Sequence, residues 1–198
     1  GLVKAGNGTF TLSGANTYTG DTSVTGGVLL LATSGSLAGG AISVSNAATL
    51  NVAAGRSTAV KTSALTITAP GAVDLNDNDM VIGSGGGTLN AGVDWTASGA
   101  LSGSGALSKT GGSTLSLTHV ANASGFSGST TVSAGTLAVA GDANLGSGTL
   151  TLNGGRLTVS DASTIDNDIV IGVGGAEIDN ANALTLSGAL TGIGLLNV

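Results

Sequence analysis

A Ser-His-Asp triad is the first chemistry to consider, because serine and aspartate are plentiful and His119 is the only histidine. In such a triad the histidine takes a proton from a serine, which many hydrolases hold in a Gly-x-Ser-x-Gly turn between strand and helix. His119 has no such neighbour and lies in a polar stretch between two alternating segments. We expect it to be an exposed loop residue, and we predict no catalytic site and no enzyme.

A calcium site is the second possibility, because Asp74, Asp77 and Asp79 lie close together in the sequence. An EF-hand loop needs glycine at its sixth position and glutamate at its twelfth. Counted from Asp74, these positions hold Asp79 and Gly85, so the motif fails. Asp and Asn side chains bond readily to nearby backbone. We therefore predict polar turns here, with no metal and no cofactor.

A polysaccharide-cleaving enzyme would need carboxylates beside basic side chains in a groove. The only arginines are Arg56 and Arg156, which are far apart in the sequence. The later acidic residues Asp161, Asp166 and Asp168 lack an obvious basic partner. This distribution argues against such an enzyme.

A glycan-binding groove usually relies on exposed aromatic rings, and this chain has few of them. They are Phe10, Tyr18, Trp95 and Phe126. We expect Phe10 to lie in the core. Tyr18 and Phe126 occupy matching positions in a sequence repeat, so we expect them to pack over a turn.

Composition excludes several classes of partner. Only five residues are Lys or Arg and the formal net charge is −6, so no basic surface exists for nucleic acid or an anionic membrane. The absence of cysteine excludes disulfides and thiolate metal sites. Hydrophobic residues make up 41% of the chain but aromatic residues only 2%, which favours a narrow aliphatic core.

Polar and apolar residues alternate along most of the chain, which is the period of a strand with one buried face. We expect roughly 22 short strands separated by glycine-rich turns, and little or no helix. The clearest alternating segments are 9–13, 41–45, 64–68, 114–118, 149–153, 156–160 and 183–187.

Long internal repeats favour a solenoid over a sandwich. The segment 2–12 recurs at 107–117, and 24–29 recurs at 132–137, so the length changes only between strands. A third segment, 77–83, recurs at 166–172. Such changes are tolerated where each coil contacts only its neighbours.

The expected fold is therefore all-β, a right-handed parallel β-helix with three strands per coil. With ~27 residues per coil there would be seven or eight coils, and the rod would be roughly 35 Å long. We expect the inward ladder to include Leu12, Val24, Leu29, Ile42, Val44, Leu50, Leu115, Leu117, Val132, Leu137, Leu150, Leu152 and Leu157.

The segment GNGTFTLSGANTYTG, residues 6–20, and the strands that follow it resemble the autotransporter-associated β-strand repeat, also called the passenger-associated transport repeat. The copies lie near 1–31 and 106–139. In the second copy Phe126 replaces the tyrosine and the loop is longer. The rest of the chain resembles a generic passenger β-helix, so we expect 1–198 to be a single β-helix fragment of a longer passenger domain.

The resemblance implies a secreted or surface-displayed protein of a Gram-negative bacterium, with a C-terminal outer-membrane barrel in the same polypeptide. It also implies a structural stalk that aids export by stepwise coil folding. The alternative is an adhesin module that binds host or neighbouring-cell ligands, or that self-associates. We expect a monomer that binds no nucleic acid.

Overall fold

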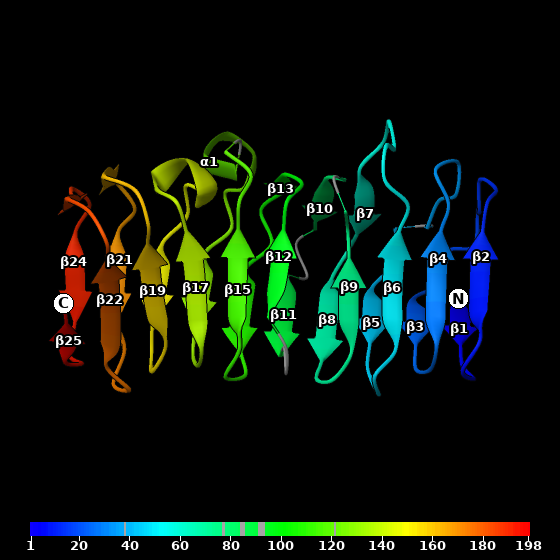
Figure 1. The fold of residues 1–198 in the computed structure, drawn as a ribbon, viewed down its shortest axis with the longest axis horizontal. Helices are drawn as coiled ribbons and strands as arrows, with labels where there is room; N and C mark the ends of the chain where they lie inside the picture. Colours follow the sequence, from blue (N-terminus) through cyan, green and yellow to red (C-terminus); the bar gives the residue numbers. More distant parts are fainter. Residues whose placement is uncertain (38, 77, 84–85, 91–93, 121) are drawn as a thin grey trace.

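The computed structural model describes residues 1–37, 39–76, 78–83, 86–90, 94–120 and 122–198. The described chain winds as a parallel β-solenoid along one long axis, with its N-terminus at one end and its C-terminus at the other (Figure 1). In Figure 1 the front strands run upward and the rear strands downward while the chain advances from right to left. This winding is right-handed, as predicted.

The first face of the solenoid is an unbroken parallel sheet of ten strands. Its strands, in order, are β1 (Leu2–Lys4), β3 (Thr22–Val24), β5 (Ile42–Val44), β8 (Leu65–Thr68), β11 (Gly87–Asn90), β14 (Leu107–Thr110), β16 (Thr130–Val132), β18 (Leu150–Leu152), β21 (Ile169–Ile171) and β24 (Leu190–Gly192).

The second face consists of two parallel sheets that follow one another along the rod. The four-stranded sheet comprises β2 (Thr9–Leu12), β4 (Val28–Leu31), β6 (Thr49–Val52) and β9 (Ala72–Asp74). The six-stranded sheet comprises β12 (Trp95–Ala97), β15 (Thr114–Leu117), β17 (Thr136–Val139), β19 (Arg156–Val159), β22 (Ala176–Asn180) and β25 (Leu196–Asn197).

The third face is the least regular. It holds a three-stranded sheet, a two-stranded sheet and two short helical turns, α1 and η1. These elements are β7 (Val60–Thr62), β10 (Met80–Ile82), β13 (Leu101–Ser102), β20 (Ser163–Ile165), β23 (Leu184–Leu186), α1 (Asn122–Gly125) and η1 (Asp142–Asn144). Helix is thus confined to single turns within the described residues. The sequence predicted three strands in every coil. In the described chain a coil has three strands only where the third face contributes one.

The coils are shorter than predicted. Leu2 pairs with Thr22 and Leu150 pairs with Ile169, so one turn takes 20 and 19 residues at these places. Ten strands in the first face mean nine full turns between β1 and β24, more than the seven or eight expected. The predicted coil length was too long because, in several coils of the described chain, the third face consists of a turn and not of a strand.

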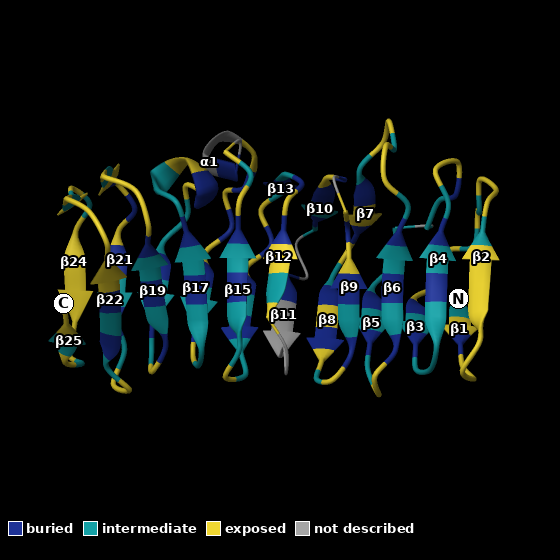
Figure 2. Cartoon of the chain, in the orientation of Figure 1, coloured by how far each residue is buried: buried dark blue, intermediate teal, exposed yellow. Residues whose placement is uncertain are grey.

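The core is a set of aliphatic ladders that runs the length of the rod (Figure 2). In β4, β6, β15 and β17 every second residue is buried and its neighbours are partly exposed. All of the predicted inward residues are buried except Leu12, which is partly buried against the core. The alternation therefore assigned the inward face correctly.

Phe10 contradicts the prediction, because 48% of it is exposed. Its register partner in the next coil is Leu29, which is fully buried. Phe10 thus takes an inward ladder position, but it lies in the first coil, where the described chain provides a covering coil on one side only. The inward direction was right and the burial was wrong.

Candidate functional site

The most unusual polar side chain in the core is Lys109, the third residue of β14. It is fully buried and occupies the inward position that Val132 and Leu152 hold in β16 and β18. Its ammonium donates hydrogen bonds to the carbonyls of Thr110 at 2.8 Å and Gly111 at 2.7 Å. A third hydrogen bond, of 3.4 Å, reaches the carbonyl of Ala134 in the next coil.

Lys4 repeats this arrangement in the first copy of the repeat. It is only 7% exposed, and its ammonium donates to the carbonyls of Ala5 at 3.1 Å, Gly6 at 2.8 Å and Gly26 at 2.7 Å. Gly26 lies in the second coil, as Ala134 lies in the coil after Lys109. Each ammonium has three N–H donors, so each finds a carbonyl for every donor. We call these two groups of carbonyls the lysine cages.

Tight glycine turns bring the cage carbonyls together. Gly6 and Gly111 both have a φ of 76°, a left-handed conformation that glycine adopts without strain. In the coil that follows each lysine, Gly27 and Gly135 lie so close to the preceding turn that an added Cβ would sit 2.4 Å from a carbonyl oxygen. The sequence therefore builds each cage with glycines on both of its coils.

The electrostatics of the second cage are set by burial. Desolvation lowers the pKa of Lys109 below its ordinary value, and the negative charge of Asp94 opposes this shift. The carboxylate of Asp94 also accepts a hydrogen bond of 2.7 Å from the amide of Thr114, at the start of β15. Because the side chain of Lys109 has no contact with solvent, its amine cannot reach a substrate. Its role is to hydrogen-bond to backbone carbonyls.

His119 is half-buried, not exposed as predicted, and it makes an interaction of its own. It lies two residues beyond β15, where the chain still follows the previous coil: the amide of Thr118 donates to the carbonyl of Ala97 at 3.1 Å. The backbone at Thr118, next to His119, is therefore still paired with the previous coil.

The aspartates of the predicted acidic cluster accept hydrogen bonds from backbone amides and from one asparagine side chain. Asp79 accepts a 2.9 Å hydrogen bond from the amide of Ala100, one coil further on. Asp74 accepts from the amide of Asn76 at 3.0 Å and from the side chain of Asn51 at 3.2 Å. Asp77 lies outside the described residues. Within the described part of the chain, no three His, Asp or Glu side chains form a group that could hold a metal ion.

The same use of aspartate recurs along the rod. Asp21 accepts from the amide of Ala41, and Asp168 accepts from the amide of Ala189, both at 2.9 Å. Each of these carboxylates precedes a first-face strand and binds the residue that precedes the next one. These aspartates link successive coils, which agrees with the predicted polar turns.

The two arginines serve different coils. Arg156 forms an ion pair of 2.7 Å with Glu177 and a second of 3.7 Å with Asp179, both from the neighbouring strand β22. Arg56 donates to the carbonyl of Ala32 at 2.5 Å. The exposed carboxylates of Asp161, Asp166 and Asp168 are not among the ion-pair partners of either arginine in the described structure.

The aromatic side chains contribute mainly to packing. Phe126 is buried, and it bridges to Gly103 of the previous coil. Tyr18, its counterpart in the first copy, is half-buried and shares a 2.7 Å hydrogen bond with the hydroxyl of Thr22. Trp95 faces inward as the register partner of Leu115. Phe126 is therefore a packing residue, whereas the contact shown for Tyr18 is a hydrogen bond to a threonine hydroxyl.

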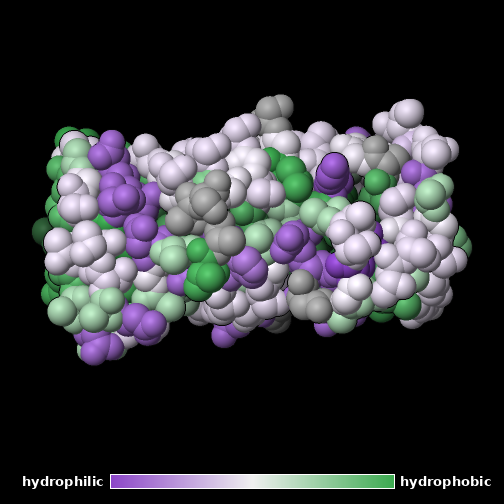
Figure 3. All heavy atoms as spheres, turned by 90° about the horizontal axis from the view of Figure 1, so that it is seen from above, coloured by the Kyte–Doolittle hydropathy of each residue, from purple (hydrophilic) through white to green (hydrophobic). Residues whose placement is uncertain are grey.

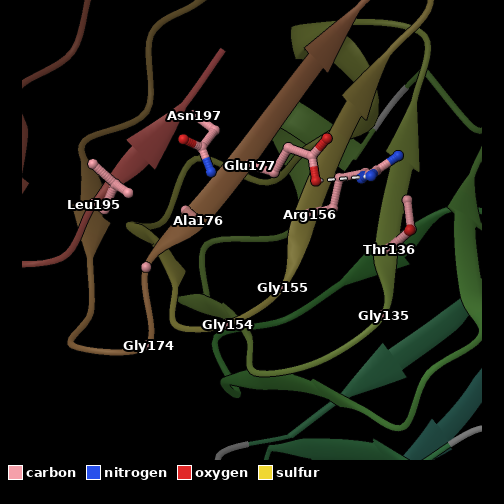
Figure 4. A pocket seen from close by; sticks show the side chains of 11 residues that line it. Gly135, Thr136, Gly154, Gly155, Arg156, Gly174, Ala176, Glu177, Leu195 and Asn197 are labelled. Atoms are coloured by element: carbon pink, nitrogen blue, oxygen red, sulfur yellow. Dashed lines mark hydrogen bonds and ion pairs between the residues drawn. The ribbon is translucent and has the colours of Figure 1, made fainter.

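A shallow open groove of about 460 Å³ lies near the C-terminal end, where the chain turns from the first face to the second (Figure 4). Glycines from successive turns form its floor, among them Gly135, Gly154 and Gly174. The ion pair between Arg156 and Glu177 lies on one wall (Figure 4). Both charges of this wall are already paired with each other.

The lysine cages are the site that reasoning from the sequence missed. The signal was present, because Lys4 and Lys109 hold the same position in the two repeat copies of a chain with only five Lys and Arg residues. A lysine inside an aliphatic ladder is rare unless its charge is satisfied. The cage itself could not be foreseen, since its third carbonyl comes from another coil.

The family model described as the passenger-associated-transport-repeat matches residues 2–31 and 107–139. Both lysine cages begin in these segments, and the match confirms the resemblance proposed for them. The matched segments cover about a third of the chain. Neither the curated proteins nor the solved structures provide a match.

The chain is thus a parallel β-solenoid with two segments that match the passenger-associated transport repeat, and this combination supports a passenger-type repeat scaffold. In the described ranges, no helix is long and apolar enough to cross a membrane.

Proposed function

We propose that this segment is the structural stalk of a secreted or surface-displayed autotransporter passenger, and that its stepwise coil folding aids export. The observation that carries the proposal is the pairing pattern. Each first-face strand from β3 to β21 hydrogen-bonds to the strand one coil before and the strand one coil after, and β1, β3, β14 and β16 lie in the matched repeats. A solenoid of this kind folds by adding one coil to the next.

Stepwise folding outside the membrane would favour outward movement of the chain over its return. Each coil that forms buries inward residues such as Leu137 and Leu157 and pairs its backbone with the coil beside it. A chain that has folded outside the membrane cannot easily return through a narrow pore. Folding free energy can therefore favour outward movement without any nucleotide.

The proposal includes a place and a partner. The place is the exterior of a Gram-negative outer membrane, and the partner is a C-terminal barrel of the same polypeptide. In this role the segment works as a monomer without a cofactor, an active site or nucleic acid. The face seen in Figure 3 mixes hydrophilic and hydrophobic side chains over the whole length of the rod, which suits an exposed stalk.

A surface-display assay of the full-length passenger tests this role. Val132→Pro places proline in β16, which is paired on both sides, where the missing N–H and the ring disrupt the sheet. We expect this variant to reach the cell surface poorly at unchanged total expression. His119→Ala and Arg156→Ala should be displayed nearly as well as the wild type.

The opposite result would favour the adhesin alternative. In that case the proline variant would be exported normally, and a polar substitution would abolish attachment to cells while display is retained. Binding of the isolated segment to a glycan array would point the same way.

A further inference from the structure

We propose that Lys4 and Lys109 fix the register in which their coils pair with the coils that follow. The inference rests on where the two ammonium groups find their hydrogen bonds. Each lysine binds two carbonyls of its own turn and one carbonyl of the next coil, Gly26 or Ala134. It stands whether or not the segment assists export.

The aliphatic ladder by itself discriminates poorly between registers. Inward residues recur with period two, so a slip of two residues keeps the same face inside. The neighbouring inward residues of this ladder are Val24, Val44 and Ile67 after Lys4, and Val132, Leu152 and Ile171 after Lys109. A slip of two residues would put Ala134 or Thr130 in the place of Val132 beside Lys109, and both are small side chains that the ladder can hold.

Two similar aliphatic segments of this chain show that the aliphatic pattern alone does not determine where a strand lies. The similar segments Met80–Ile82 and Ile169–Ile171 form strands on different faces, β10 on the third and β21 on the first. An aliphatic pattern therefore fits more than one face. The two lysine-containing copies behave differently, because β1 and β14 both lie on the first face and β2 and β15 both lie on the second.

The buried charge of the lysine distinguishes the native register from a displaced one. In a coil displaced by two residues, the carbonyl of Ala134 would move away from the ammonium of Lys109 by about the length of two strand residues, roughly 7 Å. One donor of a buried ammonium would then face an aliphatic ladder without a partner. Buried polar groups that specify a single pairing are known from coiled coils.

Cysteine pairs can report the register directly, because the chain contains no cysteine. Ser108 and Thr131 are register partners on the outer surface of the first face, and Ser133 lies two residues further along. Partner strands are ~4.8 Å apart, within reach of a disulfide, whereas the displaced pair is roughly 8 Å apart and out of reach. The pair Ser108→Cys with Thr131→Cys reports the native register, and Ser108→Cys with Ser133→Cys reports the slip.

The lysine is then replaced by methionine, which keeps the length and removes the charge. We expect Lys109→Met to form the displaced disulfide on refolding and to lose at least a third of the native one, measured by peptide mapping under non-reducing conditions. Leu152→Met, an apolar change at the same ladder position two coils on, is the matched control and should form only the native disulfide. Exclusive formation of the native disulfide in Lys109→Met, at the wild-type yield, would overturn the proposal.

Lys4→Met provides the same test if Lys109→Met fails to fold. In the described chain the strand of Lys4, β1, pairs with β3, so the replacement can be read on this one strand pair. The native pair is Val3→Cys with Ser23→Cys, and the displaced pair is Val3→Cys with Thr25→Cys. A displaced disulfide supports the register role, and its absence in a folded Lys4→Met protein contradicts it.

Discussion

The ammonium of Lys4 donates a 2.7 Å hydrogen bond to the carbonyl of Gly26, 22 residues further along the chain and one coil away. Lys109 and Ala134 stand in the same relation in the second repeat copy, at 3.4 Å. A side chain that begins in an aliphatic ladder thus ends on the backbone of the next coil. Several measurable consequences arise from this link and from the turns around it.

Truncation of the buried lysine should destabilise the rod. Lys109→Ala removes the ammonium from three carbonyls and leaves a cavity in the ladder, so we expect the free energy of unfolding to fall by ~2–4 kcal/mol. Lys109→Met fills most of the space and should lose less. Urea titration followed by circular dichroism gives both values. A loss under ~1 kcal/mol for Lys109→Ala would mean that water satisfies the cage equally well.

The lowered pKa of Lys109 predicts how stability changes at high pH. Because the folded-state pKa lies below that of the unfolded chain, the unfolded state binds more protons between the two values. The contribution of Lys109 to the free energy of unfolding should therefore rise with pH across that window and level off above about 10.4, the ordinary lysine value. Titrations at a series of alkaline pH values, with Lys109→Met subtracted, isolate this contribution.

Asp94 offers a control for that experiment. Its charge raises the pKa of Lys109 against the effect of burial, so Asp94→Asn should lower the folded-state pKa further and start the rise at a lower pH. A pH dependence that is the same in Lys109→Met and the wild type would show that other groups cause it.

The glycine that closes the second cage should not accept a side chain. Gly135 has a φ of 68°, and an added Cβ would lie 2.4 Å from the carbonyl oxygen of Ser113. We expect Gly135→Ala to cost ~1–3 kcal/mol through backbone strain and this clash. Gly112→Ala is the matched control, because an added Cβ there meets nothing within 4 Å. Equal melting temperatures for the two variants would contradict the assignment.

The inward face can be tested on one strand. In β19, Leu157 is fully buried and Thr158 points outward. Leu157→Ala should lower the free energy of unfolding by ~2–5 kcal/mol, and Thr158→Ala should change it by no more than ~0.5 kcal/mol. Denaturant titration separates these outcomes. Similar costs for both would show that the strand faces are less distinct than the structure has them.

Calcium should leave the melting temperature unchanged. Asp74 and Asp79 already accept hydrogen bonds from neighbouring groups, so their oxygens are engaged in turns. A ligand at a hundred times its dissociation constant would stabilise the fold by ~2.7 kcal/mol, which a thermal melt detects. A clear rise with calcium that a chelator reverses would restore the metal hypothesis.

The alternation of the sequence was sufficient to predict the inward ladders, because period two leaves one face for burial in every strand. Leu29, Leu50 and Leu137 are buried for this reason. The same rule could not foresee the exposure of Phe10, because exposure depends on which coils surround a strand. It also could not give the coil length, which depends on how the third face closes.

The repeats were informative to different degrees. The correspondence of 2–12 with 107–117 keeps each strand on its face. The correspondence of 77–83 with 166–172 does not, since Met80 and Ile169 begin strands on different faces. Sequence similarity of aliphatic strands therefore reports the inward direction but does not report the face on which the strand lies. This is also why the lysine cages needed the structure.

The division of the second face into two sheets has a mechanical consequence. A pull along the rod loads the hydrogen bonds between coils in series, so the coil junction with the fewest bonds sets the force that the rod withstands. Between β9 and β12, in the part of the chain that the structure describes, the first and third faces continue through β8–β11 and β10–β13 while the second face is interrupted. At this junction a pull along the rod would therefore load the first and third faces, and one lysine cage lies on either side of it.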